Sequence, residues 1–409
     1  MADYIERGLA GLLIEATETF PAVMLHGARQ TGKTTLLKHC LGKSRRYVSM
    51  ERAGLRELAE RDPEGFLDLY PPPVILDEIQ RAPGLLPSIK ERIDEDRDRC
   101  GQYILTGSQN LLMMETVSES LAGRCAVLQL HSLAHREMAG DADRPLPWEP
   151  RCELRESDDN AFGRRVGFCE RLLTGGYPDV VLGSGRHRDL WFESYVQTYV
   201  ERDVRTLRQV GDMGQFQKFV TCVALRNGQL FNMSDVARDL GLTVNTIKAW
   251  LSVLEASGLV IVLKPYFTNT NKRLVKTPKV YITDTGLLCA LAGITNAEQL
   301  ALSPFSGAVM EAAVLMEIVK GASFRGHRVR LYFWRTSNGA EVDIVVEQGY
   351  FLTPVEVKLS ATPRAGMSRG IERFRAEYGE QVTAGWVIHS GDLPMPLGNG
   401  NIALPFDAM

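Results

Sequence analysis

The chain has 409 residues, which at about 150 residues per domain corresponds to two to four domains and excludes a single small module. A composition of 44% hydrophobic and 24% charged residues excludes long disordered stretches, and a mean hydropathy of −0.11 without an apolar run of about 18 residues argues against a membrane-spanning helix. The net charge is −3, but residues 201–280 hold 12 Lys and Arg against 6 Asp and Glu, a net of +6 that leaves −9 for the rest.

The amino terminus and the cysteines bear on location. Residues 1–7 mix acidic and basic side chains without an apolar segment, so no signal peptide is expected. The seven cysteines are scattered, odd in number and form no C-x-x-C pair, which disfavours a disulfide framework and a zinc site. We therefore expect a cytoplasmic protein.

The first elements lead to a glycine-rich motif. Apolar side chains at helical spacing predict a packing helix within 4–16, and a short apolar run predicts a buried strand at 22–26. The next residues match G-x-x-x-x-G-K-[ST] at every fixed position and precede a helix-forming stretch, the setting that a P-loop requires. The candidate nucleotide-binding residues are Gly27, Ala28, Arg29, Gln30, Thr31, Gly32, Lys33, Thr34 and Thr35.

The P-loop predicts a site for a nucleoside triphosphate. Its glycines let backbone N–H groups surround the β-phosphate at a helix N-terminus, where positive potential favours an anion. Lys33 is expected to reach the β- and γ-phosphates, and Thr34 to ligate Mg²⁺.

Two acids follow the second predicted strand, 73–76. Asp77 can hold the Mg²⁺ shell while Glu78 orients and deprotonates the attacking water, the division of labour that hydrolysis of the triphosphate requires. Two acids at the carboxyl end of a buried strand are otherwise hard to explain.

The third strand, 102–105, ends in Thr106-Gly107-Ser108, where either hydroxyl could sense the γ-phosphate. Arg124 lies further along, before another apolar run. It is either a salt-bridged structural arginine or a catalytic finger that completes the site of a neighbouring subunit.

The middle of the chain is expected to be helical. Residues 137–165 carry many charges and three prolines, which predicts a long connection or insertion. Residues 168–173 and 191–204 then predict a small bundle packed on the nucleotide domain, with its Trp and Tyr stripe in the core.

Residues 232–259 predict two short helices that meet at a glycine turn. Ser234 is the expected N-cap of the first helix and Thr243 that of the second. The apolar side chains of both helices can pack together, which leaves Asn245 and Lys248 facing outward, where they could enter a groove of DNA.

Two strands, at 259–263 and 279–283, enclose a basic tip that contains Lys272 and Arg273. The helix pair and this hairpin form a winged-helix pattern inside the basic region. The module either contacts nucleic acid or only packs against the rest of the protein.

Near the carboxyl end, a hairpin is predicted with its turn at Gln348-Gly349, which would place Glu341 opposite Glu356. Because side chains alternate, one face would hold Glu341, Asp343, Glu356 and Lys358. Opposed like charges destabilise a sheet by several tenths of a kcal/mol, roughly, unless a cation lies between them.

A divalent metal held by Asp343 and Glu356, with Lys358 polarising a water or the scissile phosphate, would explain this face. The alternative is a charged face that is merely solvated. Glu311, in a helical run over 309–319, is a further candidate carboxylate.

At these motifs the chain resembles bacterial and archaeal AAA+-like ATPases whose P-loop domain is fused to a winged-helix and restriction-endonuclease-like region. The resemblance covers nearly the whole chain and rests on residues 27–34, 74–80, 106–108, 121–124, 279–287, 341–343 and 356–358. It implies ATP as the nucleotide, assembly into a ring, and nuclease-like D…E-x-K residues at Asp343, Glu356 and Lys358, with Glu311 as the helical acid. That nuclease-like fold is often kept for DNA binding without cleavage.

The expected fold is therefore α/β, with a P-loop AAA+-like domain followed by three further parts. The predicted boundaries are 1–136 for the ATPase domain, 137–205 for a connection and helical lid, 206–290 for the winged helix and 291–409 for the restriction-endonuclease-like domain.

The expected function is a Mg-ATP-dependent ATPase, a homo-oligomer with a hexameric ring as the candidate, that couples hydrolysis to translocation on, or remodelling of, duplex or branched DNA. One alternative is an ATP-gated DNA nuclease with a second divalent ion, Mg²⁺ or Mn²⁺, in the carboxyl-terminal domain. The other is a signalling ATPase whose nucleotide state switches protein partners.

Overall fold

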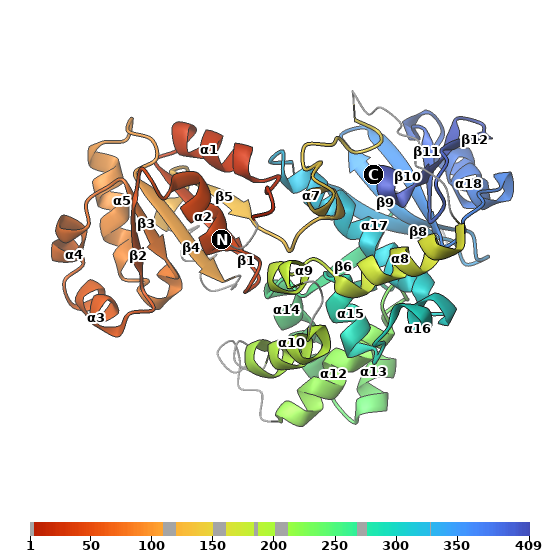
Figure 1. The fold of residues 1–409 in the computed structure, drawn as a ribbon, viewed down its shortest axis with the longest axis horizontal. Coiled ribbons are helices and arrows are strands. Elements are labelled where there is room, and N and C mark those ends of the chain that lie inside the picture. The colour runs from red at the N-terminus through yellow and green to blue at the C-terminus, as the bar shows by residue number, and fades with distance from the viewer. Residues whose placement is uncertain are drawn as a thin grey trace.

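The structure, a computed structural model, describes residues 4–108, 120–149, 161–183, 187–200, 212–267, 276–327 and 329–409. Figure 1 shows three regions: a sheet domain from the first third of the chain, a helical region, and a second sheet region built by the last third. The two sheet regions lie at opposite ends of the view, with α7 between them.

The N-terminal domain is built on a parallel five-stranded sheet in the order β2-β3-β4-β1-β5. Its strands are β1 (Ala22–Gly27), β2 (Arg46–Ser49), β3 (Val74–Asp77), β4 (Tyr103–Ser108) and β5 (Cys125–Gln129). Its helices are α1 (Ala10–Thr19), α2 (Lys33–Leu41), α3 (Ala53–Arg61), α4 (Pro63–Leu69), the 3₁₀ turn η1 (Ile79–Arg81) and α5 (Leu85–Glu95).

Both faces of this sheet are covered, which explains why its strands read as unbroken apolar runs. Met24 and Leu76 point to the cluster that contains residues of α3, α4 and α5. Leu25 and Ile75 point to the opposite cluster, which contains residues of α1 and α2. Because the strands are parallel, the carboxyl ends of β1, β3 and β4 meet at one edge.

The three strands expected in this domain are confirmed, but the helix expected within 4–16 begins only at Ala10. The residues before it follow an irregular path because the side chain of Arg7 is drawn into buried contacts with Glu137 and the P-loop residue Thr31.

The helical region contains α7 (His135–Met138), α8 (Ala161–Thr174), α9 (Pro178–Leu182), α10 (Arg188–Tyr195), the π-helical η2 (Val196–Val200), α12 (Met213–Leu225), α13 (Met233–Leu240), α14 (Val244–Ala256), α15 (Thr285–Leu291) and α16 (Ala297–Leu302). In the connection expected at 137–165, residues 139–149 are irregular, but Leu146 is fully buried. This part of the connection therefore packs into the protein.

The helix pair α13 and α14 meets at Gly241, which has left-handed backbone. Thr243 caps α14 as expected. The expected cap of α13 is wrong: the side chain of Asn232, not Ser234, accepts the hydrogen bonds of the first turn. Asn232 provides this cap because its side-chain oxygen reaches two successive N–H groups, one of them that of Ser234.

The second sheet has eight strands in the order β12-β13-β11-β10-β9-β8-β6-β7. They are β6 (Val260–Pro265), β7 (Lys279–Ile282), β8 (Arg330–Arg335), β9 (Glu341–Gln348), β10 (Phe351–Lys358), β11 (Gly385–His389), β12 (Met395–Gly398) and β13 (Asn401–Pro405). The accompanying helices are α17 (Ser306–Ser323), η3 (Ala365–Ser368), α18 (Arg369–Tyr378), η4 (Gly379–Gln381) and η5 (Phe406–Ala408).

The antiparallel hairpin β6–β7 is part of this second sheet. Lys264 and Pro265 of β6 pair in parallel with Tyr332 and Phe333 of β8. One apolar cluster also runs from Phe168 in α8 to the last residues of the chain. The helical region and the carboxyl-terminal sheet therefore share one core.

Candidate functional site

The P-loop joins β1 to α2 at the carboxyl edge of the N-terminal sheet. Gly27 ends β1, and a Cβ atom there would lie 2.1 Å from the carbonyl oxygen of Leu130, so only glycine fits. Gln30 and Gly32 have left-handed backbone, with φ of 59° and 91°, and Gly32 precedes the first residue of α2. Such backbone is typical of loops whose N–H groups converge on an anion.

Lys33 is the first residue of α2, and its side chain turns back into the loop. The ammonium donates hydrogen bonds to the carbonyl oxygens of Gly27 at 3.0 Å and Ala28 at 2.8 Å. Thr31 closes the same turn by donating to Ala28 at 2.9 Å. The loop therefore holds a buried positive charge where phosphates are expected to bind.

Asp77, at the end of β3, lies beside the P-loop. Its Oδ1 accepts a 2.6 Å hydrogen bond from Thr106, and its Oδ2 accepts one of 2.6 Å from the phenol of Tyr47. The hydroxyl of Thr34 lies 3.5 Å from Oδ1. A buried carboxylate beside the P-loop hydroxyl fits Mg²⁺, which is held at such sites by the P-loop Ser or Thr and an acid.

Glu78 follows Asp77 with left-handed backbone, φ 58°, which is uncommon for a residue other than glycine. Its N–H donates to the hydroxyl of Thr106 at 3.0 Å, and its carboxylate accepts a hydrogen bond from the side chain of Gln80. Backbone strain of this kind clusters at functional sites. Two partners on neighbouring elements thus hold the residue expected to be the catalytic base.

Thr106, one of the two candidate hydroxyl residues at the end of β4, lies at the site. It is fully buried and contacts both Asp77 and the backbone of Glu78. Ser108 ends β4, and its side chain lies outside the described residues.

Arg124 lies at the amino edge of the same sheet, opposite the P-loop. Its carbonyl oxygen accepts from the N–H of Ala22, the first residue of β1. The guanidinium makes two hydrogen bonds to Asp94, of 2.6 and 2.9 Å. In this chain Arg124 is a salt-bridged arginine that is remote from its own nucleotide site.

Two residues of the site were not predicted from the sequence. Tyr47, on β2, donates to Asp77, and burial followed by this hydrogen bond raises the pKa of Tyr47, which keeps the phenol protonated. Arg7 donates to the carbonyl oxygen of Thr31 at 2.8 Å and to Glu137 at 2.9 Å. Neither lies in a motif, and Arg7 meets a partner 130 residues away.

A segment after β5, residues 131–138, connects the ATPase domain to the rest of the protein, and we call it the strap. Ser132 donates to Asp284 at 3.1 Å, and the buried ammonium of Lys320 donates to the carbonyl oxygen of Leu133 at 2.8 Å. Asp284 precedes α15 and Lys320 lies on α17. The strap therefore contacts two helices of the distal part of the chain.

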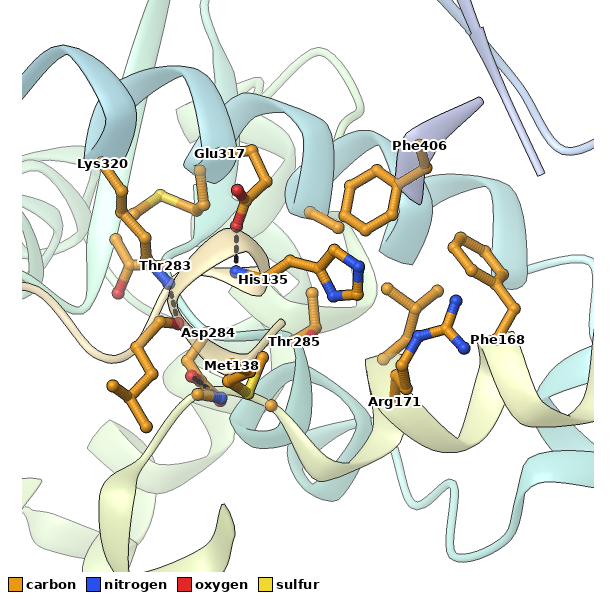
Figure 2. A pocket seen from close by; sticks show the side chains of 16 residues that line it. His135, Met138, Phe168, Arg171, Thr283, Asp284, Thr285, Glu317, Lys320 and Phe406 are labelled. Carbon is orange, nitrogen blue, oxygen red and sulfur yellow. Dashed lines mark hydrogen bonds between the residues drawn. The ribbon is translucent and has the colours of Figure 1, made fainter. Parts of the chain in front are cut away.

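Glu317, one turn before Lys320 on α17, also holds the strap. It accepts a hydrogen bond from the backbone N–H of His135 and forms a 3.3 Å ion pair with Arg136. Figure 2 shows Glu317 and Lys320 pointing from α17 toward the strap, with Asp284 beside them. A cleft beside these strap contacts, between α7 and α8, has a volume of about 600 Å³.

The carboxyl-terminal hairpin differs in register from the prediction. Its turn is Gly349-Tyr350, and Val355 pairs with Ile344, so continuing the register places Glu356 opposite Asp343. The error is two residues, and a shift by two keeps every side chain on its predicted face. Gly349 is the first turn residue because it has the left-handed backbone.

The charged face of this hairpin is covered at Glu356 and Asp343, whereas Glu341 and Lys358 are partly exposed. Glu356 is 4% exposed, and α18 lies directly over it. A Cβ atom on Gly370 of α18 would lie 2.2 Å from Oε1 of Glu356.

Four carboxylates gather here, and we call them the carboxylate cluster: Glu311, Glu341, Asp343 and Glu356. Burial, followed by repulsion from Asp343, raises the pKa of Glu311 to about 7 and raises the pKa of Glu356 well above its ordinary value. The structure thus brings the predicted nuclease-like residues together.

Two lysines lie among these carboxylates. Lys358 is 2.7 Å from Glu356 and 3.7 Å from Asp343, and Lys279 of β7 bridges Glu311 and Glu341. Among the described residues, no group of three or more His, Cys, Asp or Glu side chains is arranged to hold a metal ion. The cluster in this arrangement does not fit a divalent ion.

The predicted DNA-contacting residues are described only in part. Asn245 and Lys248 lie exposed on α14, as predicted. Lys272 and Arg273 lie outside the described residues. Two other cations of the basic region are neutralised, because Arg226 pairs with Asp239 and Arg238 pairs with Asp235.

The strand-loop-helix P-loop, the paired acids of β3 and the parallel sheet define the N-terminal third as a P-loop ATPase domain. Residues 19–139 match the family model described as an AAA domain. Residues 165–298 match a domain of unknown function, DUF8612, and residues 306–409 match another, DUF4143.

The chain is similar to uncharacterized proteins of Mycobacterium bovis and Mycobacterium tuberculosis. Each is 29% identical over 403 residues, which is 98% of this chain and 83% of the relative. The Walker-type ATPase of Pyrococcus abyssi aligns with 71% of this chain and 96% of its own at 14% identity and a TM-score of 0.45. A RuvB variant of Thermotoga maritima aligns with 62% of this chain and 86% of its own at 18% identity and a TM-score of 0.29.

In the part of the chain that the structure describes, no helix is long and apolar enough to cross a membrane.

Proposed function

We propose that this protein hydrolyses Mg-ATP at its P-loop and uses the energy to move along, or remodel, DNA. The observation that carries the catalytic part is the network in which Thr106 joins Asp77 to Glu78 beside Thr34. The DNA part rests on the exposed polar face of α14 within a basic region.

The catalytic residues have distinct tasks in this proposal. Lys33 leaves its two carbonyl partners and binds the β- and γ-phosphates, while Thr34 and Asp77 hold Mg²⁺. Glu78 orients the attacking water and accepts its proton. Bound Mg²⁺ supplies charge neutralisation at the phosphates.

Thr106 holds Oδ1 of Asp77, and Tyr47 and Ser49 hold Oδ2, so that the acid is preorganised before the nucleotide arrives. Donors that are aimed in advance need no reorganisation during the reaction. Glu78 has left-handed backbone directly after the last residue of β3, and its carboxylate is held by the side chain of Gln80.

The strap offers a route from the nucleotide site to the DNA-binding region. Arg7 joins the P-loop carbonyl of Thr31 to Glu137 at the end of the strap. Lys320 and Glu317 join the strap to α17. A change in the P-loop on hydrolysis therefore has a continuous set of buried polar contacts through which to act on the distal helices.

The proposed DNA-contacting surface is α14. Asn245 and Lys248 share its exposed side, and Ser252 lies on the same stretch. Amide and ammonium groups on the second helix of such a pair can contact base edges and phosphates in the major groove.

Oligomer formation is a further part of the proposal. Arg124 lies across the sheet from its own P-loop, so a catalytic role for it requires a neighbouring copy of the chain. A ring is the arrangement that supplies a neighbour to every subunit, and a hexamer is its expected size. Light scattering of Glu78→Gln with ATP tests this, and a monomer under those conditions would contradict it.

The main experiment measures ATP turnover across a panel of duplex, forked and four-way DNA at low salt. We expect stimulation by at least one DNA structure, and loss of that stimulation in an Asn245→Ala/Lys248→Ala double variant. Lys43→Ala is the matched control, because it removes an exposed lysine of the ATPase domain. Glu78→Gln should bind ATP and lose turnover.

The interaction-ATPase alternative predicts a different result. It requires ATP turnover that no DNA structure changes, in a protein that stays free of DNA at low salt. That outcome would contradict the proposed DNA function and leave the ATPase assignment intact.

A further inference from the structure

Lys279 occupies an unusual position, because its ammonium lies inside the carboxylate cluster. The Nζ atom is 3.0 Å from Glu311 Oε1 and 2.7 Å from Glu341 Oε1. The side chain is 3% exposed, and its third side faces the ring of Phe333 at 5.4 Å from the centroid. The ammonium has three donor hydrogens, so two carboxylates and an aromatic face enclose it nearly completely.

The cation comes from a different part of the chain than the acids. Lys279 lies on β7, the edge strand of the eight-stranded sheet, whereas Glu311 lies on α17 and Glu341 on β9. Tyr281, two residues further along β7, also donates to Glu311. The edge strand therefore delivers two donors to the same carboxylate.

The surroundings of Lys279 raise its pKa and so favour the charged ammonium. Burial alone would lower its pKa, but attraction to Glu311, Asp343 and Glu341 outweighs burial and raises the pKa above its ordinary value. The ammonium of Lys279 thus lies between two carboxylates of the cluster.

The other acids have partners as well. Glu341 also faces Arg335 at 3.2 Å, and Asp343 accepts a 2.8 Å hydrogen bond from the backbone N–H of Val357. Lys358 faces Glu356. A Mg²⁺ ion requires about six oxygen ligands near 2.1 Å. Here two ammonium groups already pair with the four acids, Lys279 with Glu311 and Glu341 and Lys358 with Glu356 and Asp343, and they would repel the ion.

We propose that Lys279 is the resident cation of the carboxylate cluster, and that it takes the place that a divalent ion would occupy. The ammonium neutralises Glu311 and Glu341 and ties β7 to α17 and β9. The carboxyl-terminal domain then holds no divalent ion at these acids and is not a metal-dependent nuclease.

The test counts Mn²⁺ ions bound by the full-length protein without nucleotide, using the electron paramagnetic resonance signal of free Mn²⁺. Wild type and Asp343→Ala should bind the same number of ions at submillimolar Mn²⁺. Lys279→Met removes the ammonium and keeps an unbranched side chain of similar length. This variant should gain one ion per protein molecule. The double variant Lys279→Met/Asp343→Ala should lose that ion again.

Two results would overturn the inference. In the first, wild type binds one more ion than Asp343→Ala, because the cluster then accepts a metal despite Lys279. In the second, folded Lys279→Met gains no ion. If Lys279→Met does not fold, the comparison of wild type with Asp343→Ala still decides, and Lys279→Arg, which keeps the charge, should match wild type.

The outcome is independent of the proposed function, because the assay contains neither ATP nor DNA. A protein whose ATPase is indifferent to DNA could still satisfy every expected result here.

Discussion

The hydroxyl of Thr106 joins the two acids at the end of β3: it donates to Asp77 at 2.6 Å and accepts from the N–H of Glu78 at 3.0 Å. Thr106→Val keeps the shape and removes both bonds. Losing a hydrogen bond to a charged group costs about 1.5–3 kcal/mol, so we expect kcat for ATP to fall about 10- to 100-fold. Steady-state ATPase kinetics measure this.

Thr106→Ser is the control for that change, because it retains the hydroxyl. It should keep most of the wild-type kcat. Equal loss in both variants would mean that packing of the methyl group, and not the hydrogen bonds, supports the site.

Asp284 joins three parts of the chain, and its removal should destabilise the protein. It accepts from Ser132 of the strap at 3.1 Å, from the N–H of Gly176 at 2.9 Å and from the N–H of Leu287 at 3.1 Å. Asp284→Ala leaves these buried donors unpaired, and we expect a loss of at least about 3 kcal/mol in urea unfolding.

Asp212→Ala is the matched control for this variant. Asp212 also caps a helix, α12, but it is exposed and its side chain accepts only from Gln215 among the described contacts. Its removal should cost about 1 kcal/mol. Equal losses in the two variants would contradict the role given to Asp284.

The nucleotide site could be predicted from the sequence because its information is local. The P-loop is a continuous motif. The ends of the other two strands, β3 and β4, can be recognised in the sequence because polar residues follow an apolar run. Parallel strands of this kind bring their carboxyl ends to one edge without any further information. The contact of Thr106 with Asp77 could not be predicted, because it depends on the packing of two strands that are 29 residues apart in the sequence.

What could not be predicted depends on contacts between distant segments. Arg7 meets Glu137 across 130 residues, and the partners of Lys279 lie on two other elements. The predicted register of the β9–β10 hairpin was wrong by two residues, because a glycine such as Gly349 can be the first or the second residue of a two-residue turn. Periodicity decides the face of a side chain, but it does not decide which buried cation faces it.

The pKa of His131, in the strap, is lowered to about 3 by burial and then by the positive charges of Lys320, His26 and Arg7. Because its pKa in the folded protein is below the ordinary 6.5, the unfolded chain binds the proton more readily. Above pH 6.5 the imidazole is neutral in both states, so its protonation takes nothing from the free energy of unfolding. As the pH falls from 6.5 toward 3, the unfolded chain binds the proton first and the free energy of unfolding decreases. Between pH 7 and pH 5 this histidine should lower the free energy of unfolding by about 2 kcal/mol.

Urea unfolding of wild type and His131→Asn at pH 7 and pH 5 measures this contribution. The variant should show a pH-dependent loss of stability that is smaller by about 2 kcal/mol. His327→Asn, which changes an exposed histidine, should behave as wild type. An unchanged pH dependence in His131→Asn would mean that other groups cause the acid sensitivity.

Gly370 lets α18 approach the carboxylate cluster. A Cβ atom there would lie 2.0 Å from the carbonyl oxygen of Glu341 and 2.2 Å from Oε1 of Glu356, so Gly370→Ala must push the helix away. We expect a loss of about 1–3 kcal/mol in unfolding free energy, the usual cost of overpacking.

Gly366→Ala is the matched control, since the nearest atom to a Cβ atom there is 3.7 Å away. ATP turnover should stay at the wild-type level in both variants, because the cluster lies outside the nucleotide site. Wild-type stability in Gly370→Ala would show that α18 can shift without cost and that the cover over Glu356 is loose.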